Sequence, residues 1–159
     1  MTRSLRRLAS RIRDEIQGLD RAVQRASEAW QRATVSSDDF YIDSVALNLH
    51  GFYAGLERLF ELIATEMDGT SPAGEAWHQL LLQQMATDIP QVRPPVLSLA
   101  SRDGLDKYRA FRHIVRNVYA FRFDPVRIGQ LVDGAGPLYA QVRAELLGFA
   151  DFLDARAEG

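Results

Sequence analysis

Apolar residues recur every three or four positions along most of the chain, which is the spacing of one face of an α-helix. The first series predicts a helix over residues 3–33, with apolar positions at Leu5, Leu8, Ile12, Ile16, Leu19, Val23, Ala26 and Trp30. The second predicts a helix over about 38–67, with apolar positions at Phe40, Val45, Leu49, Phe52, Leu56, Phe60 and Ile63. Asp38-Asp39 suits the cap and first turn of that second helix.

Proline and glycine divide the rest of the chain. Ser71-Pro72 is a normal helix entry, whereas the prolines between residues 88 and 95 predict a rigid, extended connector. The further helices are expected over 72–87, about 103–121, about 125–134 and, after an interruption at 134–137, to about 155. No alternating strand pattern of convincing length appears, so we expect an all-α, up-down bundle of about five helices forming one domain over 1–159.

Composition excludes several classes of function. The 159 residues are 47% hydrophobic and 25% charged, which is ordinary for a soluble globule. Cysteine is absent and the three histidines have no metal-ligand spacing, so neither disulfides nor a metal site are expected. Phosphate-cradling glycine loops are lacking, and no cofactor is expected. Neither a secretory leader nor a membrane-spanning run is apparent, so the expected location is cytoplasmic, away from membranes.

The helix expected near 103–121 gathers polar groups on one face. At about 100° per residue, an arc of about 160° holds Arg109, Arg112, His113, Arg116, Asn117 and Tyr119. The opposite side holds Tyr108, Ala110, Phe111, Ile114, Val115, Val118 and Phe121. No acidic residue lies between Lys107 and Asp124, whereas a merely solvated face usually mixes both charges. The pattern therefore predicts a surface suited to RNA phosphates.

The net charge of −2 conceals a second basic segment. Residues 1–25 hold seven arginines and three acidic residues. The first turns of the helix expected in this segment are either a solvated helix end or a surface that binds along RNA or binds a partner protein.

The run from Arg112 to Tyr119 resembles the signature Arg-Asn-x-x-x-His-x-Tyr of the HEPN superfamily, and within it of the HepT-like ribonuclease toxins. The signature arginine falls on Arg112, its polar second position on His113, its histidine on Asn117 and its tyrosine on Tyr119. Three segments resemble the HepT-like branch in the same chain order, namely residues 49–60, 75–85 and 93–113. The resemblance covers about residues 38–133.

This resemblance implies a HEPN-like bundle that forms a homodimer, with the two motif helices facing each other across a basic cleft. The implied activity is that of a toxin that cleaves RNA or tRNA without metal, the RNA 2′-hydroxyl attacking the adjacent phosphate. It also implies a partner, an MNT-type nucleotidyltransferase antitoxin, which in related pairs adds AMP to the motif tyrosine, here Tyr119.

Asn117 departs from the family pattern, because an amide forms hydrogen bonds but cannot act as a base. In one interpretation His113 is the base and Asn117 orients it or the phosphate, while Arg112 stabilises the phosphate. In the alternative, the chain is a catalytically inactive HEPN module that binds a nucleotidyltransferase or a nucleotide. A plain helical scaffold is a third interpretation.

Four other polar residues lie within or beside the apolar series of the expected helices. His50 is expected to be a core or inter-helix histidine rather than a site residue. For His78, a structural role and a place beside the cleft both stay open. Glu57 and Arg58 are expected to form ion pairs within or between helices.

Overall fold

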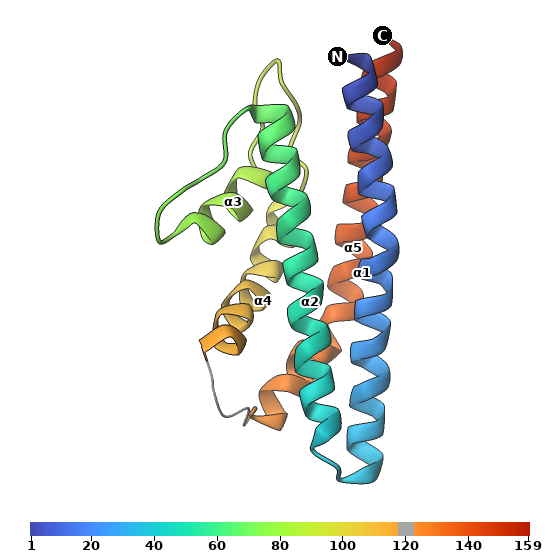
Figure 1. Ribbon diagram of the computed structural model, residues 1–159, viewed down its shortest axis with the longest axis vertical. Coiled ribbons are helices and arrows are strands. Elements are labelled where there is room, and N and C mark those ends of the chain that lie inside the picture. Colours follow the sequence, from blue (N-terminus) through green and yellow to red (C-terminus); the bar gives the residue numbers. More distant parts are fainter. Residues whose placement is uncertain (118–122) are drawn as a thin grey trace.

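The computed structural model describes residues 1–117 and 123–159, which form five α-helices and one π-helical turn (Figure 1). These are α1 (Thr2–Ser36), α2 (Phe40–Ile63), the π-helical turn η1 (Ala64–Asp68), α3 (Trp77–Met85), α4 (Leu99–Asn117) and α5 (Pro125–Glu158). Helices α1, α2, α4 and α5 alternate in direction, and both termini lie at the same end. The prediction of an all-α, up-down bundle is confirmed.

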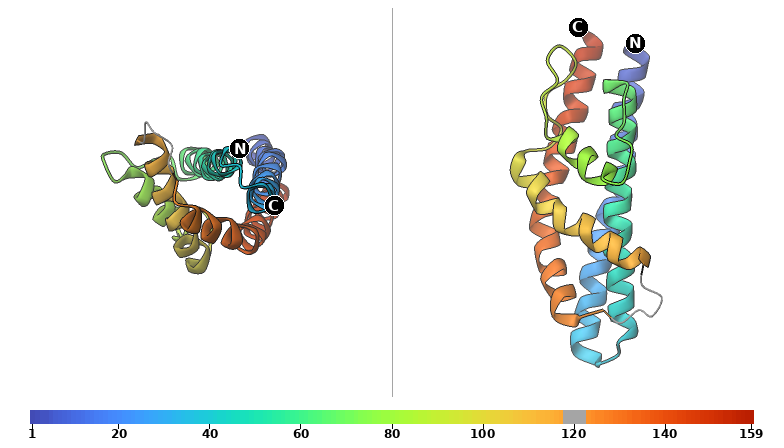
Figure 2. Two further views of the ribbon diagram at one scale, coloured as in Figure 1. Left: turned by 90° about the horizontal axis from the view of Figure 1, so that it is seen from below. Right: turned by 90° about the vertical axis from the view of Figure 1, so that its left-hand side faces the viewer.

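The long helices α1, α2 and α5 run side by side, whereas α4 crosses α2 obliquely (Figure 2). Their buried residues form one core that includes residues of all five helices. Most apolar positions expected in α1 lie in this core: Leu8, Ile12, Ile16 and Leu19 are each at most 3% exposed. Of the others expected there, Leu5, Val23 and Trp30 are partly buried against it. Gly129 allows α5 to approach α1, since a Cβ there would lie 2.7 Å from the ring of Trp30.

Helix α5 is continuous through residues 134–137, so the interruption expected there is wrong. Pro137 removes the hydrogen bond to the carbonyl of Asp133. Both residues are exposed, and water can therefore satisfy that carbonyl. On the inner face Ala135 and Tyr139 are buried, and the Tyr139 hydroxyl donates to Asp20 of α1 over 2.5 Å. Packing along α1 thus outweighs the local cost of the proline.

Two helix starts also differ from the prediction. Helix α3 begins at Trp77 rather than near residue 72, because Gly74 has a φ of +95°, which no α-helix contains. Helix α4 begins at Leu99 rather than near residue 103, because the Ser98 hydroxyl caps it by accepting the N–H of Ser101 over 3.1 Å. The expected end of this helix at residue 121 lies outside the described residues.

The connector between α3 and α4 is non-helical, as expected, but it turns back on itself instead of staying extended. Arg93 fixes it to the end of η1 through two 2.7 Å hydrogen bonds to the carboxylate of Asp68. Its guanidinium also donates to the carbonyl groups of Thr87, Pro94 and Gln84. The side chains of this Asp68–Arg93 clamp are 2% and 0% exposed. The clamp therefore fixes both α3 and the start of α4 relative to α2.

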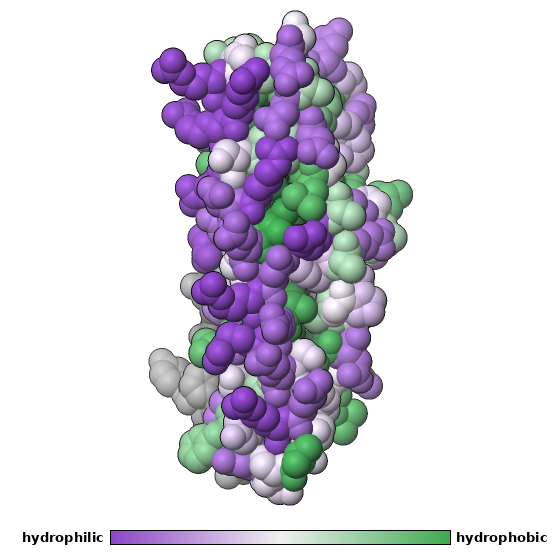
Figure 3. Space-filling model, turned by 90° about the vertical axis from the view of Figure 1, so that its right-hand side faces the viewer, coloured by the Kyte–Doolittle hydropathy of each residue, from purple (hydrophilic) through white to green (hydrophobic). Residues whose placement is uncertain are grey.

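The face of the bundle opposite α3 and α4 is mainly hydrophilic (Figure 3). In α1, Arg13 forms ion pairs with Asp151 and Asp154 of α5 at 2.9 and 2.7 Å. Arg3, Arg6 and Arg7 near its start are exposed. Within the described ranges, no helix combines the length and the apolar character that a bilayer crossing requires.

We predict that Asp68→Ala lowers the free energy of unfolding by about 3–5 kcal/mol, because the buried Arg93 loses its counter-charge. Urea denaturation measures this, with Glu66→Ala as the control, since Glu66 is exposed two residues earlier and its loss should cost under about 0.5 kcal/mol. Adding Arg93→Met to Asp68→Ala should recover part of the loss. Equal stabilities for Asp68→Ala and Glu66→Ala would contradict the structural role of the clamp.

Candidate functional site

Helices α2, α3 and α4 meet around the carboxylate of Glu57, which is 3% exposed. Its Oε2 lies 2.6 Å from Nδ1 of His78 in α3, and its Oε1 lies 3.3 Å from Nη1 of Arg112 in α4. A buried carboxylate needs such partners, because an unpaired charge away from water is costly. Glu57 therefore forms the inter-helix ion pair expected from the sequence, whereas Arg58 beside it is exposed.

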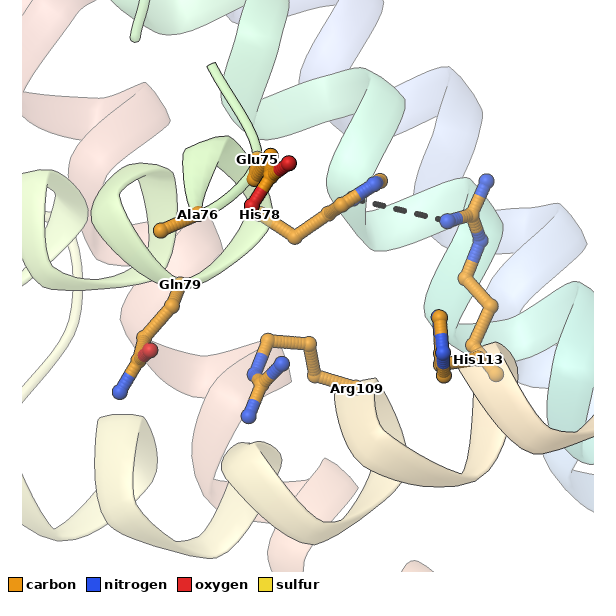
Figure 4. Close-up of a pocket in the computed structure, with 7 residues that line it drawn as sticks. Glu75, Ala76, His78, Gln79, Arg109 and His113 are labelled. Carbon is orange, nitrogen blue, oxygen red and sulfur yellow. Dashed lines mark hydrogen bonds between the residues drawn. The ribbon is translucent and has the colours of Figure 1, made fainter. Parts of the chain in front are cut away.

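The short contact between Glu57 and His78 sets the tautomer of the imidazole. A carboxylate only accepts hydrogen bonds, so Nδ1 carries the proton and Nε2 carries the lone pair of the neutral ring. Nη1 of Arg112 lies 3.5 Å from the same Nδ1, the contact dashed in Figure 4. In this tautomer that contact is no hydrogen bond, because both nitrogens carry protons. Arg112 and His78 are held side by side through the carboxylate that they share.

The side chain of Arg112 is only 19% exposed, which is less than expected for a residue on the polar face of α4. Its Nε is buried and has no hydrogen-bond partner within the described part of the chain. An unsatisfied donor of this kind costs free energy.

The orientation of α4 comes from its apolar side. Tyr108 and Phe111 are 1% and 2% exposed, as predicted. The Tyr108 hydroxyl donates to the carbonyl of Leu131 in α5 over 2.6 Å, and burial raises the pKa of Tyr108 to about 12. Ile114 was expected on this buried side but is 37% exposed. The buried side of α4 therefore turns Arg109, Arg112 and His113 away from α5.

A pocket of about 580 Å³ lies between α3 and α4 (Figure 4). Its lining consists of Glu75, Ala76, His78, Gln79, Arg109, Arg112 and His113. Two guanidinium groups and two imidazoles thus converge on one space, whose size is within the range of small-ligand pockets. Among the described residues, no group of three or more His, Cys, Asp or Glu residues could hold a metal ion.

Acidic groups lie in the pocket and beside it. Arg109 Nε lies 2.8 Å from Oδ1 of Asp106, one turn earlier in α4, and Asp106 is half exposed. A partly exposed pair within one helix contributes little stability, so a phosphate could take the place of the Asp106 carboxylate. Glu75 stands before α3 at the rim.

Tyr53 lies one helical turn before Glu57 and is 1% exposed. Burial, and after it the negative charge of Glu57, raise the pKa of Tyr53 well above its ordinary value. The phenol therefore stays protonated beside the carboxylate and adds no charge to the site.

The structure places three of the predicted site residues, Arg109, Arg112 and His113, around the same pocket. Arg116 and Asn117 belong to the end of α4, but their side chains are not described, and Tyr119 lies outside the described residues. His78 takes the place beside the pocket that the sequence left open. The sequence did not identify Glu57 as a site residue, although a lone acid on the apolar line of α2 was the available signal.

Comparison with known families finds a match over most of the chain. The family model described as HepT-like protein covers residues 44–153, from the second turn of α2 into the last third of α5. This range includes the four segments that carry the resemblance. Searches of curated proteins and of solved structures returned no match.

Proposed function

Because the chain belongs to the HepT-like protein family, we propose that it is the HEPN-type toxin of a toxin–antitoxin pair and cleaves RNA or tRNA without metal. The observation that carries this proposal is the pocket in which Arg109, Arg112, His78 and His113 converge. Guanidinium groups bind phosphate through paired N–H donors, and imidazole exchanges protons near neutral pH.

The proposed reaction is attack of a ribose 2′-hydroxyl on the neighbouring phosphorus. Arg112 stabilises the negative charge that develops on the phosphoryl oxygens. His113, at the open side of α4, acts as base or acid. Arg109 and Arg116 bind the RNA backbone, and Asn117 orients the phosphate or an imidazole by hydrogen bonding.

The quaternary structure is part of the same proposal. By its family resemblance the chain forms a homodimer that brings two motif helices together across a two-fold axis. The proposed antitoxin is an MNT-type nucleotidyltransferase, with Tyr119 as the residue that it modifies with AMP.

Asn117 favours a second candidate function. An amide at the position of the signature histidine removes the family's proton acceptor. The second candidate is therefore an inactive HEPN module whose pocket binds a nucleotide or whose surface binds a nucleotidyltransferase. The dimer and the partner are the same in both cases, and only cleavage separates them.

We predict that Arg112→Ala lowers RNA cleavage by about 10²–10³-fold and relieves the growth defect caused by expression without a partner. Arg112→Lys should recover little activity, because an ammonium keeps the charge without the planar pair of donors. Arg25→Ala is the control: it removes the same charge from an exposed site on α1. A wild type that is as harmless as Arg112→Ala, and that cleaves no RNA, would favour the inactive module.

A second prediction concerns the altered signature. His113→Ala should reduce cleavage strongly while thermal unfolding stays unchanged, because His113 is exposed. Asn117→Ala should reduce it only in part, and Asn117→His should keep or raise it. If Asn117→His creates activity in an otherwise inactive protein, the chain is a HEPN module that lost its base.

A third prediction is that analytical ultracentrifugation shows a dimer at micromolar concentrations. Its motivation is the resemblance, which assigns each active site to residues from two chains. Sedimentation as a monomer throughout the concentration range would overturn the dimeric cleft.

A further inference from the structure

The imidazole of His78 is the best-positioned proton acceptor of the pocket. Its Nδ1 is held by the Glu57 carboxylate at 2.6 Å, and its ring lies 3.6 Å from that of Trp77. The side chain is 23% exposed and lines the pocket. Its Nε2 has no hydrogen bond to any described residue and is not one of the buried polar atoms that lack a partner. The ring is thus fixed on one side and accessible on the other.

We propose that His78 is a catalytic residue that accepts the 2′-hydroxyl proton at Nε2, and that Glu57 is its positioning residue. The inference rests on the proposed RNA cleavage and assigns the base that Asn117 cannot supply. A carboxylate at Nδ1 fixes the tautomer with a free Nε2, and it stabilises the imidazolium formed once the proton is taken. The second imidazole of the pocket, His113, is then the proton donor.

The two imidazoles account for every proton of the step. The bond between the 2′-oxygen and phosphorus forms while the bond between phosphorus and the 5′-oxygen breaks. His78 takes the proton of the 2′-hydroxyl, and a protonated His113 gives one to the departing 5′-oxygen. The products are a 2′,3′-cyclic phosphate and a 5′-hydroxyl. Exchange of one proton with water restores both imidazoles, and no further reactant is needed.

The charged groups around His78 are compatible with its proposed role as proton acceptor. Glu57 faces it from α2, Arg112 and Arg109 face the pocket from α4, and Glu75 stands before α3. Arg112 binds the same carboxylate as His78, at the other oxygen, Oε1, over 3.3 Å. The guanidinium is thereby close to the reacting phosphate without displacing the imidazole from its carboxylate.

One readout is independent of cleavage. In the full-length protein with ¹⁵N-labelled histidine, His78 should appear as the Nδ1–H tautomer, and its signals should move when inorganic phosphate is added. Glu57→Gln should weaken this tautomer preference, whereas Glu66→Gln, an exposed acid of the same helical segment, should leave it unchanged. A wild-type His78 with its proton on Nε2 would overturn the assignment.

The second readout is the pH dependence of kcat/KM on a short RNA. The pH profile of the wild type should be bell-shaped. In His78→Gln the ascending limb should disappear, and kcat/KM should fall by about 10²–10⁴-fold. In Glu57→Gln the limb should move to lower pH, because the imidazolium loses its counter-charge. A merely structural His78 would change thermal unfolding and leave both limbs in place.

The failures of the two proposals are distinguishable. If wild type and His78→Gln both cleave RNA with the same bell-shaped pH profile, the assignment of His78 as base is overturned, but the proposed RNA cleavage is not. If wild type cleaves no RNA at all, the proposed function fails and the role of His78 as base fails with it.

Discussion

A carboxylate that folding removes from water has to be paired, and Glu57 imposes that constraint on three helices at once. Its two oxygens are bound by His78 and Arg112, so one side chain links α2 to both α3 and α4. A buried ion pair of this kind adds little net stability, but breaking it is costly. The same atoms therefore select one arrangement of the helices and place the polar groups of the pocket.

The short helix α3 depends on its neighbours for its structure. Nine residues are too few for a stable isolated helix, and the segment before it contains a glycine in the left-handed region. Two anchors replace the missing intrinsic stability: the Glu57–His78 contact near its start and the Asp68–Arg93 clamp behind its end. Substitutions in the Asp68–Arg93 clamp should therefore shift α3 and alter the pocket that it lines.

The sequence predicted those features that local spacing determines. Apolar periodicity located α1 and α2, and the polar arc of α4 grouped Arg109, Arg112 and His113, which line one pocket. Local patterns failed at Pro137, where exposure to water makes the loss of one backbone hydrogen bond tolerable. They also failed at Ser98, which was not recognised as the cap of α4. They also missed the contact between Glu57 and His78. These residues are 21 positions apart on different helices, and no spacing rule connects them.

Helix α1 has a consequence for work with fragments of the chain. The family match starts at residue 44 and therefore excludes α1. That helix nevertheless buries Leu8, Ile12, Ile16 and Leu19 against the rest of the bundle. A fragment cut at the limits of the match would leave apolar stripes of α2 and α5 open to water, and exposed surfaces of that kind promote aggregation. The unit of folding is thus larger than the unit of sequence similarity.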